Sequence, residues 1–237
     1  MDDSFDAPRQ SLLDVVQEKL QKQGKTVVYS RLVYVASLEA KVTDKEALQA
    51  FHEQIFASSR PEDKPDHTGM LLVFPNCFVH VIETQTKHIL SFLRELSKIS
   101  AADRPYGGMR IISSTEDIPA RVFSQWFCTF CTAPTQDKYE TIQKEELVTC
   151  ASDINLKFIK FGKQLSEMSE KEVQSAMQDL RAAYVELPTT NQVVGLILSD
   201  EPPTLEEFMD IYDCPIDIDL DSENVWPMQI PITFGNQ

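Results

Sequence analysis

The order of apolar segments between residues 26 and 131 constrains the fold of this chain more than any other feature. Runs rich in Val, Ile, Phe and Tyr, which favour β-strands, alternate with stretches in which apolar residues recur every three or four positions. The helical stretches begin near Thr43, where Glu46 completes a capping box, and at Thr86. The strand-like runs are Thr26–Leu38, Met70–Phe74, Cys77–Ile82, Met109–Ser113 and Val122–Cys131.

This order of segments is the ferredoxin-like βαββαβ plan with one added strand. We therefore predict an α+β domain over residues 26–131, with two helices on one face of the sheet and the other face open. We expect Gly107-Gly108 to break the chain before the fourth strand.

The segments on both sides of this domain have different patterns. Residues 1–25 are predicted to form an N-terminal helical segment, because Ser11–Gln23 has an amphipathic pattern. Residues 132–237 are predicted to form a helical and acidic extension. Within it we expect a helix over Glu145–Gln164, with Ser152-Asp153 as a point where it could be interrupted. We also expect a helix after the capping box at Ser169, a short buried strand over Val193–Leu198 and a short helix after Thr204.

Acidic residues outnumber basic ones and gather toward the C-terminus. The sequence has 37 Asp and Glu against 22 Lys and Arg, a formal net charge of −15, and neither Lys nor Arg follows Arg181. The segment between Glu186 and Glu223 is rich in carboxylates. Such a segment repels phosphate groups, which argues against nucleic acid and anionic membranes as partners.

Two interpretations of the acidic segment stay open. It either folds back on its own domain and keeps the protein soluble, or it docks on a partner protein with a basic surface. In the docking hypothesis Phe208 and Tyr212 are apolar anchors, and Asp217, Asp219 and Asp221 are charges at the rim of the contact.

The expected compartment is the cytoplasm. The apolar runs are far shorter than the ~20 residues that cross a bilayer, and Met1–Asp6 is acidic, unlike a secretory signal. Five cysteines, an odd number, fit thiols in a reducing compartment better than a disulfide framework.

Catalytic and metal-binding motifs are weak in this sequence. Cys128 and Cys131 have CxxC spacing, but a zinc site needs further ligands, and residues i and i+3 of a strand point to opposite faces. Neither a Gly-rich phosphate loop nor a nucleophile elbow is found. His80 alone among the histidines lies inside an apolar strand, where a hydrogen-bonded structural role is the usual one. We therefore expect neither enzyme activity nor a metal site.

Four motifs in sequence order carry a resemblance to a known domain. They are Arg31-Leu-Val-Tyr34-Val-Ala-Ser37, Thr68-Gly-Met-Leu-Leu-Val-Phe74, Phe78-Val-His80-Val-Ile-Glu83 and Arg121-Val-Phe-Ser-Gln-Trp126. Together they resemble the BLUF domain, the flavin-binding blue-light sensor, over roughly Arg31 to Phe130.

The resemblance assigns positions to a flavin cleft. In BLUF domains a Tyr, an Asn and a Gln surround the flavin ring, and the Gln amide rearranges its hydrogen bonds after light absorption. Tyr34 matches that Tyr, His80 stands in place of the Gln, Trp126 matches a Trp and Cys128 falls at a Met position. The Asn should fall near Pro61 or Glu62.

The missing amides change what the resemblance implies. A Gln amide offers both a donor and an acceptor, and none of the residues at these positions has an amide side chain. We therefore expect a vestigial cleft, lined by Tyr34, Phe78, His80, Trp126 and Cys128, without a flavin cofactor and without photochemistry. The alternative is a sensor domain that binds flavin or another small ligand.

The chain as a whole, including its acidic extension, resembles a family of vertebrate testis-expressed proteins with a degenerate BLUF-like core. That resemblance implies a male germ-cell setting, in or near the sperm flagellum. The function we expect is a non-enzymatic protein-interaction or structural module, an assembly component of the flagellar axoneme.

Overall fold

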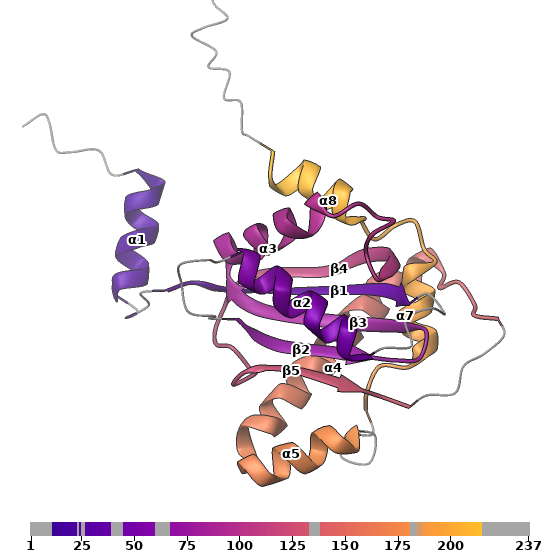
Figure 1. Cartoon of the computed structure of the whole chain (residues 1–237). Helices are drawn as coiled ribbons and strands as arrows, with labels where there is room; N and C mark the ends of the chain where they lie inside the picture. The colour runs from indigo at the N-terminus through magenta and orange to yellow at the C-terminus, as the bar shows by residue number, and fades with distance from the viewer. Residues whose placement is uncertain are drawn as a thin grey trace, which may run out of the picture.

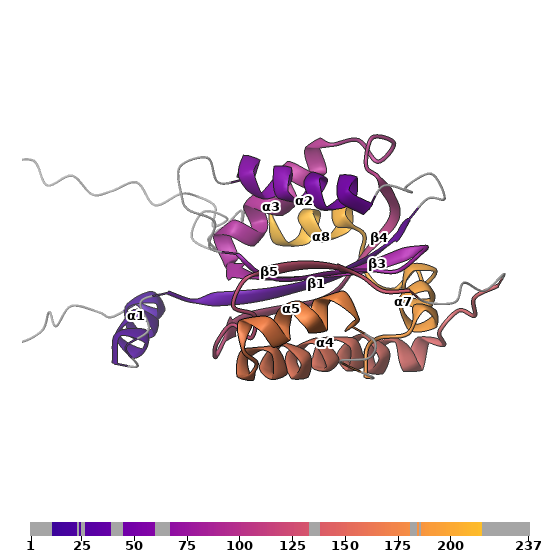
Figure 2. The same ribbon diagram turned by 60° about the horizontal axis from the view of Figure 1, so that its bottom comes forward.

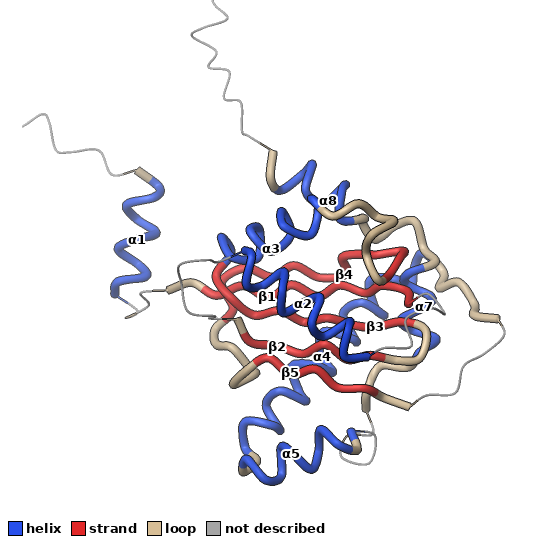
Figure 3. Tube along the Cα trace, viewed as in Figure 1, coloured by secondary structure: helices blue, strands red, loops and turns tan. Residues whose placement is uncertain are grey.

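The fold is that of a computed structural model, which describes residues 11–22, 24, 27–38, 45–59, 67–132, 138–180, 184 and 186–214. The described residues form a five-stranded mixed sheet with the strand order β4-β1-β3-β2-β5 (Figures 1 and 3). Its strands are β1 Tyr29–Leu38, β2 Thr68–Val73, β3 Cys77–Gln85, β4 Tyr106–Ile118 and β5 Trp126–Phe130.

The connections confirm the predicted ferredoxin-like α+β plan. Helix α2 (Lys45–Ser59) joins β1 to β2, and helix α3 (Thr86–Lys98) joins β3 to β4. The pairs β1–β3, β1–β4 and β2–β3 are antiparallel, and the added strand β5 pairs with β2 in parallel. Both helices lie on the same face of the sheet, as Figure 2 shows.

The prediction of an open second face is wrong. Figure 2 shows α4 (Lys144–Glu167) and α5 (Glu170–Gln178) under the sheet, with α7 (Thr190–Ile197) at one end. Residues of all these helices share a buried cluster with inward-facing residues of the sheet. Strands β2 and β3 are therefore buried along nearly their whole length, since neither face meets water. The extension beyond residue 132 therefore supplies the helices that cover this second face.

The helix boundaries agree with several sequence signals. Helix α1 (Leu12–Lys22) forms where the amphipathic pattern lies. Helix α4 runs without interruption, and the capping boxes at Ser169 and Thr204 start α5 and α8 (Leu205–Tyr212). The capping box at Thr43 lies outside the described residues.

Two local predictions are wrong for identifiable reasons. Val193–Leu198 is not a strand, because α7 begins at Thr190 behind a capping box formed by Thr189 and Gln192. A short apolar run suits a buried helix as well as a strand. The Gly107-Gly108 pair lies inside β4 rather than before it, since Gly108 has a φ of 54° at a register shift against β1. A bulge at such a point bends the strand without ending it.

A buried carboxylate ties together three strands and the segment before β5. Oε1 of Glu83 accepts hydrogen bonds from Nε of Arg31 at 2.8 Å and from its Nη2 at 2.6 Å. Oε2 accepts from the backbone N–H of Val122 at 2.9 Å, that of Phe123 at 3.2 Å and the hydroxyl of Thr68 at 3.3 Å. Residues 122 and 123 therefore donate to this carboxylate instead of to a neighbouring strand, and β5 begins at Trp126 rather than at Val122.

Replacing Glu83 by Gln should lower the free energy of unfolding by about 3–5 kcal/mol, because Arg31 would stay buried without its counter-charge. Glu95→Gln is the matched control. Its ion pair with Lys98 lies on the surface of α3 and should contribute within about 0.5 kcal/mol. Urea denaturation of both variants measures the difference, and equal stabilities would contradict the assigned role of Glu83.

Gly69 occupies a backbone conformation that a side chain disfavours. Its φ is +138°, and a Cβ built there would lie 2.0 Å from the carbonyl oxygen of Val81 on the paired strand. The Thr68-Gly69 pair of the sequence motif thus reflects a close approach of two strands.

Gly69→Ala should therefore cost at least about 3 kcal/mol of folding stability. Gly107→Ala is the control, because its Cβ would meet only the Ser37 hydroxyl at 3.5 Å. Thermal or urea denaturation of the two variants tests the prediction. A Gly69→Ala protein as stable as the Gly107→Ala protein would rule it out.

Candidate functional site

The residues that the motifs placed at the cleft do come together. Tyr34 on β1, His80 on β3 and Trp126 on β5 lie in the layer between the sheet and the helices α2 and α3. Tyr34, Phe78 and His80 are fully buried, and Trp126 is half-buried. The expected facing of these side chains is confirmed. Cys128 belongs to the same layer.

These side chains form one continuous chain of hydrogen bonds. Nε1 of Trp126 donates to Nε2 of His80 at 2.9 Å, and Nδ1 of His80 lies 2.7 Å from the hydroxyl of Tyr34. The same hydroxyl lies 3.0 Å from Nε2 of His52 on α2. Nδ1 of His52 lies 2.9 Å from the carbonyl oxygen of Leu48, which ends the chain.

The end groups allow one arrangement of protons in this chain. The indole N–H of Trp126 can only donate, so Nε2 of His80 accepts and Nδ1 carries the proton that His80 donates to Tyr34. The carbonyl of Leu48 can only accept, so Nδ1 of His52 is protonated and its Nε2 accepts the Tyr34 hydroxyl proton. We assign the tautomers from this network. Each ring nitrogen of the two histidines then has a partner.

His52 was not found by sequence reasoning, although a signal for it exists. It lies four residues after Leu48 and three before Ile55, so it shares the apolar stripe of α2. A histidine on such a stripe is expected to face the core. Only the tertiary structure shows that it faces Tyr34 on a different element.

Aromatic rings surround the hydrogen-bonded chain. Phe78 packs edge-on against Tyr106 at 5.0 Å between ring centroids, and Phe56 packs against Trp126 at 5.7 Å. Phe92 on α3 lies 6.1 Å from the ring of His80. The layer that a flavin ring would enter in a BLUF domain therefore contains packed rings from both helices and from the sheet.

Burial keeps the titratable groups of this site neutral. It lowers the pKa of His52 to about 4, against a smaller opposing effect of its bond to Leu48. Burial, followed by the neighbouring His52 and His67, lowers the pKa of His80 well below its ordinary value. Burial also raises the pKa of Tyr34 well above its ordinary value. The protons and lone pairs of these groups are engaged in the hydrogen-bond chain.

The cysteines of the CxxC spacing do not share a site. Cys128 faces the layer of Tyr34, whereas Cys131 belongs to the cluster on the opposite face. Burial raises the pKa of Cys128 to about 12, and that of Cys77 likewise. The described part of the chain, which contains every cysteine, has no disulfide.

Among the described residues, no three His, Cys, Asp or Glu side chains are placed to hold a metal ion. Every described helix is too short or too polar to cross a bilayer.

Phe208, predicted as an apolar anchor for a partner, is buried within its own domain in this structure. Phe208 is only 5% exposed, and with Leu205 it belongs to the buried cluster that contains Tyr34. The spacing i, i+3 on a capped helix was the signal for this facing. Tyr212 is 60% exposed and stacks on Phe208 at 4.4 Å between centroids. Asp217, Asp219 and Asp221 lie outside the described residues.

Several acids of the extension pair with basic residues of the same chain. The described pairs agree with the interpretation in which this segment folds back on its own domain. They are Glu186–Lys160, Asp200–Arg110, Glu201–Lys144, Glu206–Arg104 and Asp213–Arg94.

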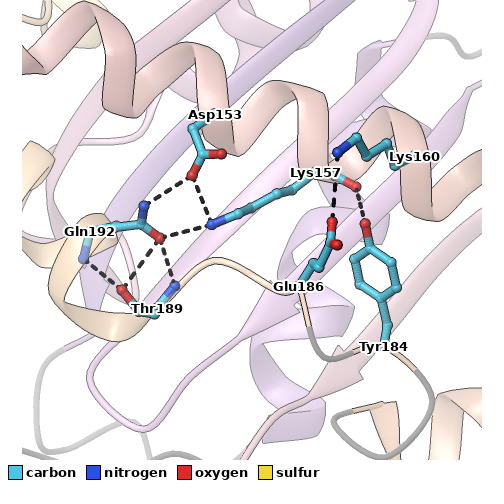
Figure 4. Close-up of polar contacts among 7 residues, drawn as sticks. All are labelled: Asp153, Lys157, Lys160, Tyr184, Glu186, Thr189 and Gln192. Atoms are coloured by element: carbon cyan, nitrogen blue, oxygen red, sulfur yellow. Dashed lines mark hydrogen bonds and ion pairs between the residues drawn. The ribbon is translucent and has the colours of Figure 1, made fainter.

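A second polar cluster joins α4 to the start of α7 (Figure 4). Nζ of Lys157 lies 2.7 Å from Oδ2 of Asp153 and 3.2 Å from Oε1 of Gln192, and Nε2 of Gln192 donates to Asp153 at 3.0 Å. The hydrogen bond from Lys157 lowers the pKa of Asp153. A cavity of about 510 Å³ lies beside it, with Cys150 in its lining. Because these polar atoms bond one another, the cluster serves to hold the two helices together.

The neutral histidines predict a loss of stability in mild acid. Below pH ~6.5 the unfolded chain takes up protons at His52 and His80 that the folded chain excludes, because their folded pKa values are depressed. The free energy of unfolding should therefore fall as the pH drops from 6.5 toward 5, by up to about 1.4 kcal/mol per pH unit for each histidine. Above pH ~7 neither group should contribute a slope.

Urea denaturation at several pH values, with wild type and His52→Gln, measures this effect. The variant should be less stable at pH 8 but should lose about half of the pH slope, since one of the two titrating groups is gone. Identical slopes in both proteins would show that His52 does not titrate as inferred.

Comparisons with solved structures give matches among BLUF proteins. The chain is similar to the structure titled BlrP1 BLUF at 16% identity, covering 66% of this chain and 88% of that chain with a TM-score of 0.35. It is similar to BlrB, a BLUF protein in its dark state, at 19% identity, covering 65% and 96% with a TM-score of 0.32.

The chain is also similar to a larger protein, a bacterial light-regulated adenylyl cyclase, at 16% identity, covering 63% of this chain with a TM-score of 0.34. The matched region spans 39% of the length of that cyclase. Because these TM-scores are below 0.5, the fold assignment rests on the strand order and connections. A family model described as testis-expressed protein 47 matches residues 28–214, which is most of the chain. The chain therefore belongs to the testis-expressed protein 47 family.

Proposed function

We propose that this chain is a non-enzymatic protein-interaction or structural module of male germ cells, with a BLUF-like core that has lost flavin photochemistry. The observation that carries the proposal is the closed hydrogen-bond chain from Trp126 to Leu48. A buried polar network of this kind is stable when every member has a partner, as here.

The network supports a structural role for groups that would be photochemical in a BLUF domain. Tyr34 would be the electron donor, and its hydroxyl already accepts from His80 and donates to His52. An imidazole with both nitrogens bonded cannot supply the switch between donor and acceptor that a Gln amide makes. A flavin between the helices would also have to displace Phe56, which packs against Trp126 and Phe92.

The setting and partners belong to the same proposal. The family description supports expression in testis, and we propose a cytoplasmic role in or near the flagellar axoneme. We propose that the partners are other proteins, and that one of them presents a basic surface to Asp217, Asp219 and Asp221. The paired acids from Asp200 to Asp213 are not available for that contact while they bond their own domain.

Flavin retention tests the loss of the cofactor directly. Full-length protein is expressed with added riboflavin, incubated with FMN and FAD, and passed through gel filtration. We expect no flavin absorbance, near roughly 450 nm, in the protein peak, because the cofactor would bring that absorbance with it. BlrB treated in the same way is the positive control.

Two features oppose flavin binding, namely the missing amide at position 80 and the side chains of His52 and Phe56 in the layer, and the variant His80→Gln separates them. It restores the amide of the BLUF motif but leaves His52 and Phe56 in place, so it should also elute without flavin. A wild-type protein that stays yellow after gel filtration would overturn the proposal and favour the alternative, a sensor that binds flavin or another small ligand.

A further inference from the structure

The segment from Asp200 to Asp213, which we call the acidic strap, passes the β4 edge of the sheet and continues onto the face that carries α3. It contains α8, which contacts α3 and β4 and lies on the same side of the sheet as α3 (Figure 2). The backbone N–H of Ile111 on β4 donates to the carbonyl of Pro203 at 2.9 Å. Nη1 of Arg110 donates to the carbonyl of Pro202 at 3.2 Å. The strap therefore covers part of an edge that would otherwise offer unpaired backbone groups.

Basic side chains from α3, from the loop after it and from β4 receive the strap. Arg94 binds Asp213 through both carboxylate oxygens, Arg104 lies 3.1 Å from Glu206, and Arg110 lies 3.2 Å from Asp200. In a chain with a net charge of −15, such a group of arginines is a distinct feature. We call the surface made by Arg94, Arg104 and Arg110, together with the apolar residues of α3 and β4 that lie beneath α8, the basic groove.

One face of α8 packs against the apolar residues of the basic groove. Leu205 is fully buried and Phe208 nearly so, and both belong to the buried cluster that contains Phe92 of α3 and Tyr106 and Met109 of β4. The opposite side of α8 faces solvent, with Ile211 68% exposed. The groove thus binds an amphipathic helix by its apolar face and by its acids together.

Several of the ion pairs that hold α8 in place have an exposed partner. The side chain of Glu206 is 62% exposed and that of Asp200 is fully exposed, so their attraction to the arginines is screened by salt. A helix of eight residues is marginal by itself and depends on its docking. The buried residues of α8 are Leu205 and Phe208, and an element held by so few buried side chains opens at a lower free energy than the whole domain.

We propose that the basic groove is a docking site for an acidic amphipathic helix of a partner protein, and that α8 is its internal ligand. This inference rests on the proposed function as an interaction module and names the class of partner. The matching segment has a helix with apolar residues at i and i+3, as at Leu205 and Phe208, and a carboxylate at i+1, as at Glu206. A further carboxylate precedes the helix, as Asp200 does, and another follows its last residue, as Asp213 does. A partner helix longer than α8 adds contacts along α3 and displaces it.

A labelled peptide of residues 199–213 serves as the probe, and fluorescence anisotropy with full-length protein measures its binding. Wild type should bind weakly, because α8 fills the groove. The variant Leu205→Ala/Phe208→Ala should bind at least about tenfold more tightly, since the competent state is then more populated. A second released variant, Asp200→Asn/Glu206→Gln/Asp213→Asn, keeps the apolar anchors and should also gain affinity. Circular dichroism checks that each variant folds.

Charge reversal tests whether the peptide occupies the basic groove. Adding Arg104→Glu and Arg110→Glu to the released variant should abolish binding, and a peptide with Asp200→Lys and Glu206→Lys should restore it. Lys98→Glu is the control on α3, because Lys98 pairs only with Glu95 of the same helix among the described ion pairs. Raising the salt concentration should weaken binding to the released variant.

Binding that is absent in both folded released variants, or unchanged by the arginine reversals, overturns the proposal. If light scattering shows dimers that the peptide dissociates, the occupant is α8 of a second copy and the assignment to a partner protein is wrong. The flavin measurement is independent of these outcomes. If the protein is free of flavin but does not bind the peptide, only the docking proposal is wrong. If the protein retains flavin, the proposed function is wrong.

Discussion

The buried carboxylate of Glu83 is the constraint on which the arrangement of this protein depends. It binds Arg31 of β1 and receives backbone N–H groups from residues 122 and 123, just before β5. Those bonds set where β5 starts and bring Trp126 to the rim of the layer under α2 and α3. From there the indole donates to His80. The hydrogen-bond chain of the candidate site is thus positioned by an ion pair outside it.

The layer between the sheet and the helices α2 and α3 is filled by hydrogen-bonded and aromatic side chains. A Gln amide has two donors and an acceptor and tolerates more than one arrangement, whereas the imidazole of His80 has one of each in its neutral form. With Trp126 on one side and Tyr34 on the other, both are in use. His52 then ends the chain on the backbone of its own helix. The result is a polar network inside an aromatic core.

Some acidic side chains of the chain form ion pairs within the protein, and the remaining excess gives the net negative charge. The acids of the strap bind arginines on α3, β4 and the loop between them, although a net charge of −15 would suggest a uniformly repulsive surface. Because those pairs lie at the surface, they set the position of α8 more than they stabilise it. The same complementarity defines which helix another protein would have to offer.

The sequence by itself determined the strand and helix order and the helix starts at Ser169 and Thr204, because period-two and period-3.6 patterns and capping residues act locally. The facing of Tyr34 and His80 followed from the resemblance to the BLUF motifs, since their strands are buried on both faces. The sequence did not determine that Val193–Leu198 is helical, since a short apolar run has no period of its own. Nor did it reveal that His52 meets Tyr34, that Phe208 is buried or that the acids of the strap have partners. Those facts depend on contacts between segments far apart in the chain, and only the tertiary structure decides which distant surface each segment meets.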